Sequence, residues 1–410
     1  MLETPRANRL HIGIYGKRNA GKSSIINFIT NQNIALVSNI KGTTTDPVYK
    51  AMELLPIGPV VFIDTAGIDD IGEMGTLRVQ RTKEVINKTD LGILVISAEQ
   101  VPYDTKDLTL ELEWCQLLKK KSIPVVGVLN KIDLIENKEI IKENLKMLKK
   151  IFDISFVSIS AEDKINLDEL KANIIKLTPE SFQSYTLVGD IVKPGDKVLL
   201  VAPQDIQAPK GRLILPQVQV LRDLLDNKAI PVTVTLDNLD LGLEMLNNKP
   251  DLIITDSQVF KLVHSKIDDN VPLTSFSIIM AREKGDLKEF VQGAKEIRNL
   301  KSGDKVLIAE ACTHHQLKGD IAREKLPTWL KSIEENIVVD NFSGKDFPEN
   351  LKEYKLVIHC GSCMFNRAEV MSRIESCRAA GVSITNFGIA IAEINGILDR
   401  VTRPFNIQGY

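Results

Sequence analysis

Cysteine is scarce in this sequence, and its scarcity excludes one class of protein. Only 5 of the 410 residues are cysteine, and a small, odd number in a large chain is not a secreted disulfide framework. In a reducing compartment, the remaining uses of cysteine are packing, metal binding and catalysis.

Long apolar runs and an excess of one charge are also missing. No stretch approaches the roughly 20 apolar residues that span a bilayer, and the first residues lack the basic start, apolar run and cleavage site of a signal peptide. The formal net charge is −2, so no overall basic field attracts nucleic acid. We therefore expect a cytoplasmic protein that binds neither membrane nor nucleic acid.

Apolar runs and amphipathic stretches alternate through the first part of the chain. Up to residue 177, runs such as "PVVFIDTAG" alternate with helical patterns such as "KEIIKENLKMLKKIF", which is typical of a mostly parallel sheet flanked by helices. Further strands are predicted at "LHIGIYG", "LGILVIS", "IPVVGVLNK" and "ISFVSIS", and a helix at "GKSSIINFIT". The polar segment 178–185 is interpreted as a linker.

The rest of the chain contains a short internal similarity. "GDKVLLVAP" (195–203) and "GDKVLIAEA" (303–311) lie 108 residues apart, and each predicts a turn followed by a buried strand, opening a smaller α/β unit. Helices are predicted at "LPQVQVLRDLLDNK" and "LPTWLKSIEE", and strands at "IPVTVTL", "DLIITD", "NIVVDNF", "KLVIHCG" and "GVSITNFG". We therefore predict three α/β domains, 1–177, 186–270 and 271–410.

A phosphate-binding pattern, "GKRNAGKS" (16–23), lies where a strand gives way to a helix. Gly16 and Gly21 permit the tight backbone path, Lys22 reaches the terminal phosphate oxygens, and Ser23 can ligate magnesium. The residues of this loop expected to contact nucleotide or its ions are Gly16, Asn19, Ala20, Gly21, Lys22, Ser23 and Ser24.

Two further motifs follow later strands. "DTAG" (64–67) places Asp64 to hold magnesium through water and Gly67 to donate an amide to the terminal phosphate. In "NKID" (130–133), the carboxylate of Asp133 can accept hydrogen bonds from guanine that adenine cannot donate. Asn130 and Lys131 are expected to brace that loop, and Ser160 with Ala161 to complete the guanine pocket.

These elements, in this order, resemble the translation-factor-like GTPases, and within them the tRNA-modification and Era-like group. "KGTTTD" (41–46) is similar to the first switch of that group, with Thr44 as the magnesium-sensing threonine, or Thr43 or Thr45 under a one-residue shift. The resemblance implies a Ras-like P-loop GTPase domain that uses GTP and Mg²⁺. The catalytic residues it implies are Lys22, Thr44, Asp64 and Gly67.

Two positions bear on the rate of hydrolysis. Ile68 follows "DTAG", so the glutamine that orients water in Ras-like enzymes is missing. Asn19 matches an asparagine that helps to bind a monovalent cation in potassium-dependent relatives; the alternative is a simple turn residue. We expect slow, magnesium-dependent GTP hydrolysis that potassium or a partner accelerates.

Three cysteines gather with histidines near the end of the chain. Cys312 and Cys360 each end a predicted strand, and the carboxyl edge of an open α/β sheet is where such folds build ligand sites. Cys363 follows Cys360 at C-x-x-C spacing, His314 lies two residues after Cys312, and His359 immediately precedes Cys360. This clustering predicts a metal site.

The spacing alone leaves the metal open. Three thiolates with optional imidazoles suit either a Cys₃His zinc site or an iron–sulfur cluster with an incomplete thiolate set. A redox dithiol of Cys360 and Cys363 is a further alternative, which would leave Cys312 without a role. Cys115 and Cys377 fall in helical patterns and are interpreted as small buried hydrophobes.

The combination of motifs resembles the GTPase scaffold family of [FeFe]-hydrogenase maturation. This combination consists of an N-terminal GTPase, Cys-x-His, 44 intervening residues and His-Cys-x-x-Cys. The resemblance implies a dimerisation domain at 186–270 and a cluster-binding domain at 271–410, both Rossmann-like, with a [4Fe–4S] cluster on Cys312, Cys360 and Cys363. It also implies a homodimer that accepts a diiron precursor from radical maturation enzymes and delivers it to apo-[FeFe]-hydrogenase.

The sequence leaves the fourth cluster ligand and one competing function open. The fourth cluster ligand could be His314, His359, a carboxylate such as Glu310 or an exogenous molecule, and either histidine could instead support the site from behind the ligands. The competing function is an RNA-modification or ribosome-assembly GTPase with a structural zinc. That function predicts an RNA-binding module, but residues 185–410 show neither a G-x-x-G clamp nor an aromatic and basic stripe.

Overall fold

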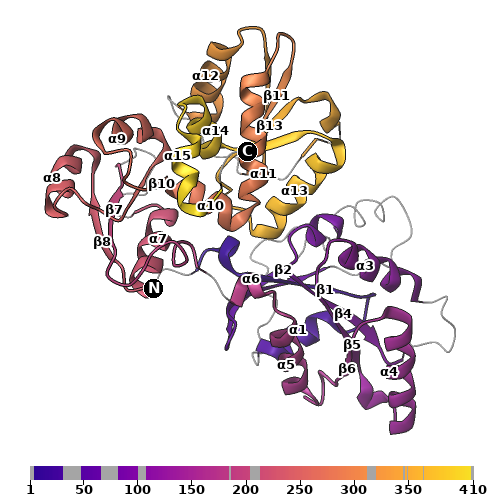
Figure 1. Ribbon diagram of the computed structural model, residues 1–410. Helices are drawn as coiled ribbons and strands as arrows, with labels where there is room; N and C mark the ends of the chain where they lie inside the picture. The colour runs from indigo at the N-terminus through magenta and orange to yellow at the C-terminus, as the bar shows by residue number, and fades with distance from the viewer. Residues whose placement is uncertain are drawn as a thin grey trace. The chain divides into compact units, whose positions relative to one another are not determined.

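The computed structural model divides the chain into two compact units, Met1–Tyr185 and Thr186–Tyr410 (Figure 1). It describes residues 4–30, 48–65, 82–99, 108–183, 186–203, 213–311, 320–344, 347–348, 350–362 and 364–407. The division falls at the end of the predicted linker, but that polar segment also contains the short helix α6 (Glu180–Gln183). Across these described ranges no helix is both long and apolar enough to cross a bilayer.

The first unit is built on a six-stranded sheet with strand order β2-β3-β1-β4-β5-β6. Its strands are β1 (Leu10–Tyr15), β2 (Val48–Leu54), β3 (Gly58–Asp64), β4 (Leu91–Ser97), β5 (Val125–Asn130) and β6 (Phe156–Ser158). Strands β1, β4 and β5 are buried along their whole length, which is why they read as continuous apolar runs. The five predicted strands are confirmed; the antiparallel edge strand β2 has no counterpart in the prediction.

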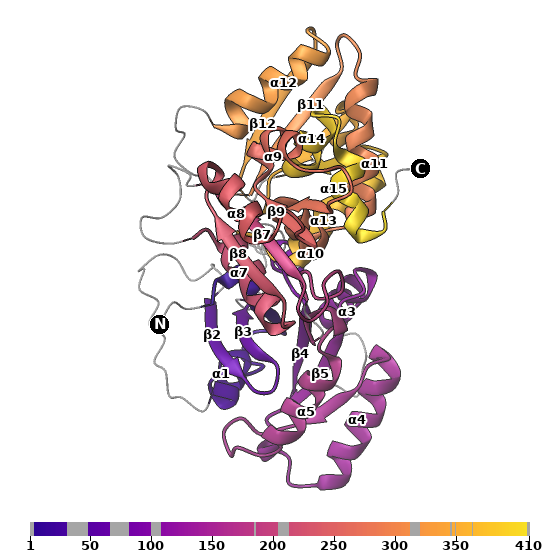
Figure 2. The same cartoon turned by 60° about the vertical axis from the view of Figure 1, so that its left-hand side comes forward.

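Helices cover both faces of this sheet (Figure 1, Figure 2). They are α1 (Lys22–Thr30), α3 (Thr109–Lys120), α4 (Lys138–Phe152) and α5 (Leu167–Leu177). Apolar side chains of α1 and α5 pack into one core, and those of α3 and α4 into another. Because β1 ends at Tyr15 and α1 begins at Lys22, within the phosphate-binding pattern, that loop lies at the carboxyl end of β1.

The second unit contains two four-stranded sheets in which all paired strands are parallel. One has the order β10-β9-β7-β8 and the other β12-β11-β13-β14. The first consists of β7 (Lys197–Val201), β8 (Ile230–Val234), β9 (Leu252–Thr255) and β10 (Leu273–Ser275); the second of β11 (Lys305–Glu310), β12 (Val338–Ser343), β13 (Leu356–His359) and β14 (Ser383–Asn386). The predicted α/β class is confirmed in both units.

The two sheets open with the same turn, as the internal similarity predicts. Gly195 and Gly303 adopt left-handed φ values of 90° and 88°, a conformation that favours glycine. The next residue in each turn, Asp196 or Asp304, accepts a 2.8 Å hydrogen bond from the amide three residues before it. Each turn then leads into the second strand from one edge of its sheet.

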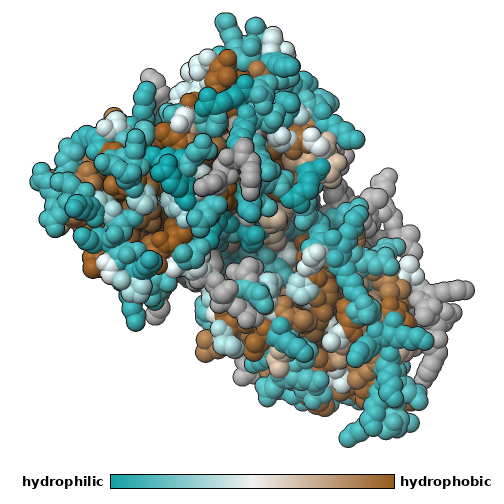
Figure 3. All heavy atoms as spheres, in the orientation of Figure 1, coloured by the Kyte–Doolittle hydropathy of each residue, from teal (hydrophilic) through white to brown (hydrophobic). Residues whose placement is uncertain are grey.

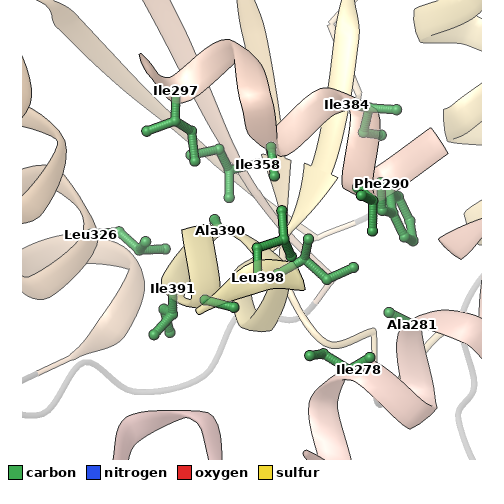
Figure 4. Close-up of a cluster of buried hydrophobic side chains, with 14 of the residues drawn as sticks. Ile278, Ala281, Phe290, Ile297, Leu326, Ile358, Ile384, Ala390, Ile391 and Leu398 are labelled. Carbon is green, nitrogen blue, oxygen red and sulfur yellow. The ribbon is translucent and has the colours of Figure 1, made fainter. Parts of the chain in front are cut away.

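A helix that follows the last strand of each sheet packs on the other sheet. Helix α11 (Leu287–Lys295) follows β10 in the chain but lies against β14, where Thr385 Oγ1 donates to the Phe290 carbonyl at 2.8 Å. Helix α15 (Leu398–Thr402) follows β14 but packs against β10, and Arg400 donates to Asp269 at 2.9 Å. Figure 4 shows side chains of both halves, among them Ile278 and Leu398, in one buried cluster.

This reciprocal packing makes one compact unit from the two predicted domains. The division predicted at residue 270 also separates β10 from the sheet to which it belongs. The other helices of the unit are α7 (Leu215–Asp226), α8 (Leu239–Met245), α9 (Phe260–Lys266), α10 (Phe276–Lys284), α12 (Leu326–Ile333), α13 (Arg367–Ala380) and α14 (Phe387–Ile394).

Candidate nucleotide site and candidate cluster site

The phosphate-binding loop depends on close backbone approach. Gly21 has a φ of 92°, and a Cβ atom there would lie 2.1 Å from Asn130 Nδ2, so only glycine is accommodated. Asn19 also has a left-handed φ, 62°, and its side chain is exposed. Lys22 is buried, and its Nζ donates to the carbonyl oxygens of Gly16 at 2.7 Å and Lys17 at 2.8 Å. The loop therefore curves around the lysine ammonium.

The two residues predicted to hold magnesium lie together. Ser23 Oγ donates to Asp64 Oδ2 at 2.5 Å, whereas the other carboxylate oxygen, Oδ1, is buried without a hydrogen-bond partner in the described part of the chain. Burial raises the pKa of Asp64, while the Ser23 hydrogen bond and the charges of Lys22 and Lys50 oppose that rise. A hydroxyl beside an unsatisfied carboxylate oxygen fits Mg²⁺, which prefers oxygen ligands.

Asn130 joins three of the predicted motifs. Its Nδ2 donates to the Ala20 carbonyl at 2.9 Å, and its Oδ1 accepts from the Ala161 amide at 3.3 Å. Lys131 has a left-handed φ of 64° and pairs with Glu99 at 3.1 Å. Asp133 lies exposed two residues further on. The described guanine-pocket motifs are thus brought to one end of the phosphate loop.

Of the other residues predicted for this site, the structure describes Ser160 and Ser24. Ser160 is buried and accepts from the Asp163 amide at 2.9 Å, and Ser24 is exposed in the first turn of α1. Thr44, with Thr43 and Thr45, and Gly67, with Ile68, lie outside the described residues.

At the candidate cluster site, β11 and β13 are parallel neighbours that end at Glu310 and His359. Just beyond them, Cys360 Sγ accepts a 3.0 Å hydrogen bond from the Ala311 amide. Cys312, His314 and Cys363 lie outside the described residues. The residues that are described contain no group of three potential metal ligands, and Cys115 and Cys377 are buried, as predicted.

The loop after Cys360 turns its carbonyl groups toward the protein. Ser362 has a left-handed φ of 57°. The Cys360 carbonyl accepts from Asn386 Nδ2 at 3.2 Å, and the Ser362 and Phe365 carbonyls accept from Lys284 Nζ. The amides of Gly361 and Ser362 have no acceptor among the described residues. Free amides in such a turn suit an anionic ligand, including cluster sulfides.

His359 is buried and both of its ring nitrogens are engaged. Nε2 lies 2.9 Å from Arg373 Nη1, and a guanidinium only donates, so Nε2 must be the unprotonated nitrogen. Nδ1 lies 3.0 Å from both Ser362 Oγ and the Cys360 carbonyl. Burial, and then the charge of Arg373, lower the pKa of His359 to about 3. This geometry favours His359 as a support behind the ligands rather than as a ligand.

Glu310 is also engaged, in a small polar network at the end of β11. One carboxylate oxygen accepts from Arg323 Nε at 3.1 Å and from Ser343 Oγ at 3.0 Å. Sequence reasoning missed three residues that organise this site, Lys284, Arg373 and Asn386. Only Asn386 has a signal in the sequence, its position at the end of the predicted strand "GVSITNFG".

Comparison with known proteins identifies the second unit. Residues 187–285 match a family model described as hydrogen maturase F dimerization domain, and residues 288–404 match one described as hydrogen maturase F tetramerization domain. Together these two models cover more than half of the chain. The chain belongs to the hydrogen maturase F family. This confirms the resemblance found in the sequence and shows that oligomerisation domains of that family are present.

The first unit of this hydrogen maturase F member carries a GTPase domain, since residues 11–131 match a family model described as 50S ribosome-binding GTPase. GTPase Der of Wolinella succinogenes is 34% identical over 175 residues, covering 42% of this chain and 36% of that protein. The tRNA modification GTPase MnmE of Thermoanaerobacter sp. is 38% identical over 170 residues, covering 41% of this chain and 34% of that protein.

GTPase Era of Heliobacterium modesticaldum is 28% identical over 170 residues, covering 41% of this chain and 55% of that protein. The similarity thus spans between about a third and about a half of the length of these curated relatives. The matches confirm the Ras-like fold predicted for the first unit and support the prediction of a GTP hydrolase.

Proposed function

We propose that this chain is a GTP-hydrolysing iron–sulfur scaffold of [FeFe]-hydrogenase maturation. It holds a [4Fe–4S] cluster through Cys312, Cys360 and Cys363, accepts a diiron precursor from radical maturation enzymes and delivers it to apo-hydrogenase. The observation that carries the proposal is the 3.0 Å hydrogen bond from the Ala311 amide to the Cys360 sulfur, in a member of the hydrogen maturase F family. The contact supports a shared site, because it brings the residue before Cys312 next to that sulfur.

The surroundings of Cys360 suit a negatively charged cluster. An amide that donates to a ligating sulfur stabilises the thiolate, and the amides of Gly361 and Ser362 are available to cluster sulfides. When bound, the cluster supplies an iron that three thiolates leave open to a further ligand. Because the Nε2 lone pair of His359 already accepts from Arg373, His314 or an exogenous molecule is the better candidate for that ligand.

The first unit supplies the chemistry of GTP binding and hydrolysis. Lys22 neutralises phosphate charge, Ser23 and Asp64 hold Mg²⁺, and Asp133 selects guanine. Asn19 is proposed to bind K⁺, which would compensate for the glutamine that is absent at Ile68. The exposed side chain of Asn19 at a left-handed turn position supports this role.

The homodimer is proposed to form through the first sheet of the second unit, in the region predicted at 186–270. Strand β8 is an edge strand of that sheet, and exposed edges pair readily with other chains. Apolar side chains are exposed on α7, β8 and α8, namely Val218, Leu225, Ile230, Leu241 and Met245; Figure 3 shows brown hydrophobic patches over this part of the surface. A cytoplasmic location stays a prediction.

The test measures metal and nucleotide chemistry separately on the full chain. Protein reconstituted without oxygen should be brown and contain roughly four iron and four sulfide ions per chain. Lys22→Ala should abolish GTP hydrolysis and leave the iron content unchanged. Protein that retains zinc but takes up no iron and sulfide would instead support the structural-zinc alternative.

The cation proposal has its own test. Exchanging sodium for potassium should raise the rate of GTP hydrolysis several-fold in the wild type, and Asn19→Ala should remove the difference. Equal wild-type rates in the two salts would leave Asn19 as a turn residue.

A further inference from the structure

A buried lysine of α10 reaches the loop that carries Cys360. Lys284 is the last residue of α10, and its side chain is only 4% exposed. Its Nζ donates to the carbonyl oxygens of Ser362 at 2.9 Å and Phe365 at 3.0 Å. Because these two residues lie on either side of Cys363 in the chain, the ammonium is held against the backbone of the proposed ligand loop.

The contact joins the two halves of the second unit. Helix α10 lies in the region matched by the dimerization domain model, and the loop lies in the region matched by the tetramerization domain model. In the opposite direction Arg367, the first residue of α13, donates to the carbonyl oxygens of Glu283 at 2.6 Å and Gly285 at 2.8 Å. These four hydrogen bonds fix the end of α10 against the loop.

The charge of Lys284 gives it a role beyond this attachment. The two carbonyl oxygens orient the ammonium but are neutral, whereas a cluster ligated by thiolates becomes more negative when it is reduced. A cation in a buried position acts on that charge more strongly than an exposed cation, because solvent and salt screen it less. A buried ammonium on this loop therefore favours the reduced state of the cluster.

We propose that Lys284 raises the reduction potential of the cluster by holding a positive charge against the backbone of Ser362 and Phe365. The proposal rests on the proposed function, because it requires that a cluster is bound. It gives the first half of the second unit, residues 186–285, which contains no cysteine, a direct influence on the metal chemistry of the other half.

The experiment is a redox titration of the reconstituted full chain, followed by EPR. At a fixed applied potential, the ratio of reduced to oxidised cluster in Lys284→Met should be at least tenfold lower than in the wild type, which corresponds to a midpoint about 59 mV more negative for one electron. Lys284→Arg should stay close to the wild type. The matched control is Lys288→Met, which removes the same charge from an exposed position in α11 and should change the ratio by less than about twofold.

A Lys284→Met protein with the iron content and midpoint of the wild type would overturn the proposal. If this variant does not fold or takes up no iron, the comparison of Lys284→Arg with Lys284→Gln decides. Glutamine keeps hydrogen-bond donors without the charge. A midpoint that is lower in Lys284→Gln than in Lys284→Arg supports the proposal. Equal midpoints in the two variants, or no cluster in either, overturn it. A wild-type chain that binds no cluster would instead remove the proposed function itself.

Discussion

The two sheets of the second unit share an architecture but differ at the ends of their strands. Both begin after the same glycine turn and have the same order of strands. The first sheet presents Thr255 and Asp256 at the end of β9, where the second presents His359 and Cys360 at the end of β13. Turns and buried strands thus specify the architecture, and strand-end residues are free to specify chemistry.

The largest expected effect is a difference in bound iron between substitutions at these two equivalent strand ends. Cys360→Ser should remove most of the bound iron, because a serine hydroxyl is a poor substitute for a thiolate ligand. Asp256→Ser, at the matching place after β9, should leave the iron content unchanged. Iron per chain after anaerobic reconstitution measures both effects.

The controls for this prediction are Cys115→Ser and Cys377→Ser, at cysteines that are buried in helices. Both should retain iron, although some loss of stability is expected from a buried hydroxyl. Iron loss in Asp256→Ser as large as in Cys360→Ser would show that the sheets do not differ in chemistry as proposed.

A smaller effect is expected where the two halves touch at equivalent positions, Ser277 in α10 and Gly388 in α14. A Cβ atom at Gly388 would lie 2.0 Å from Ser277 Oγ, so Gly388→Ala should destabilise the unit by about 1–3 kcal/mol. Adding Ser277→Gly makes room and should recover part of that loss. Urea unfolding of both single variants and the double variant measures the coupling, and strictly additive losses would contradict it.

Substituting the glycine of either opening turn should lower the stability of the unit by the same amount. Gly195→Ala and Gly303→Ala should each lower the free energy of unfolding by about 1–2 kcal/mol, because both glycines have a left-handed φ. A Cβ at either position would meet no atom within 4 Å, so backbone strain is the cause and not a clash. Gly361→Ala, at a glycine that also has open space but no left-handed φ, should cost less than about 0.5 kcal/mol in the metal-free protein. Urea unfolding measures these losses. Unequal losses at the two turns would contradict the equivalence that their similar backbone geometry predicts.

The smallest effect concerns the carboxylates of these turns. Asp196→Ala and Asp304→Ala each remove one acceptor of a backbone amide, and each should cost about 1 kcal/mol. The exposed Asp399→Ala substitution in α15 serves as a surface control in the same urea unfolding series. A loss of stability at only one turn would show that water replaces the carboxylate as acceptor for the amide of the other turn.

The sequence predicts the elements and motifs that follow local rules. Strands such as β1 and β13 read as buried because parallel strands covered on both faces are almost wholly apolar, and "NKID" lies at a strand end where its roles require it. Strand β10 escapes prediction because three residues are too few for an apolar pattern to be distinctive. Strand β2 escapes it because its burial is mixed.

Supporting residues of the candidate cluster site are unpredictable for a different reason. Lys284 lies in the last turn of a helix, where a basic residue is ordinary, and Arg373 reads as a charged residue within the helix α13. Their partners, Ser362 and His359, are respectively 78 and 14 residues away in the chain. Only the tertiary packing of α10 and α13 brings such pairs together, so no local pattern records them.

The reciprocal packing of α11 and α15 also has a consequence for synthesis of the chain. Strand β10 ends at Ser275, but α15, which packs against it, begins only at Leu398. A ribosome that adds about 5–20 residues per second needs on the order of ten seconds to make the residues between them. During that interval, the first sheet lacks α15, one of the helices that pack against it. A product that stops after α11 lacks both β14 and α15, so neither α11 nor β10 has its partner.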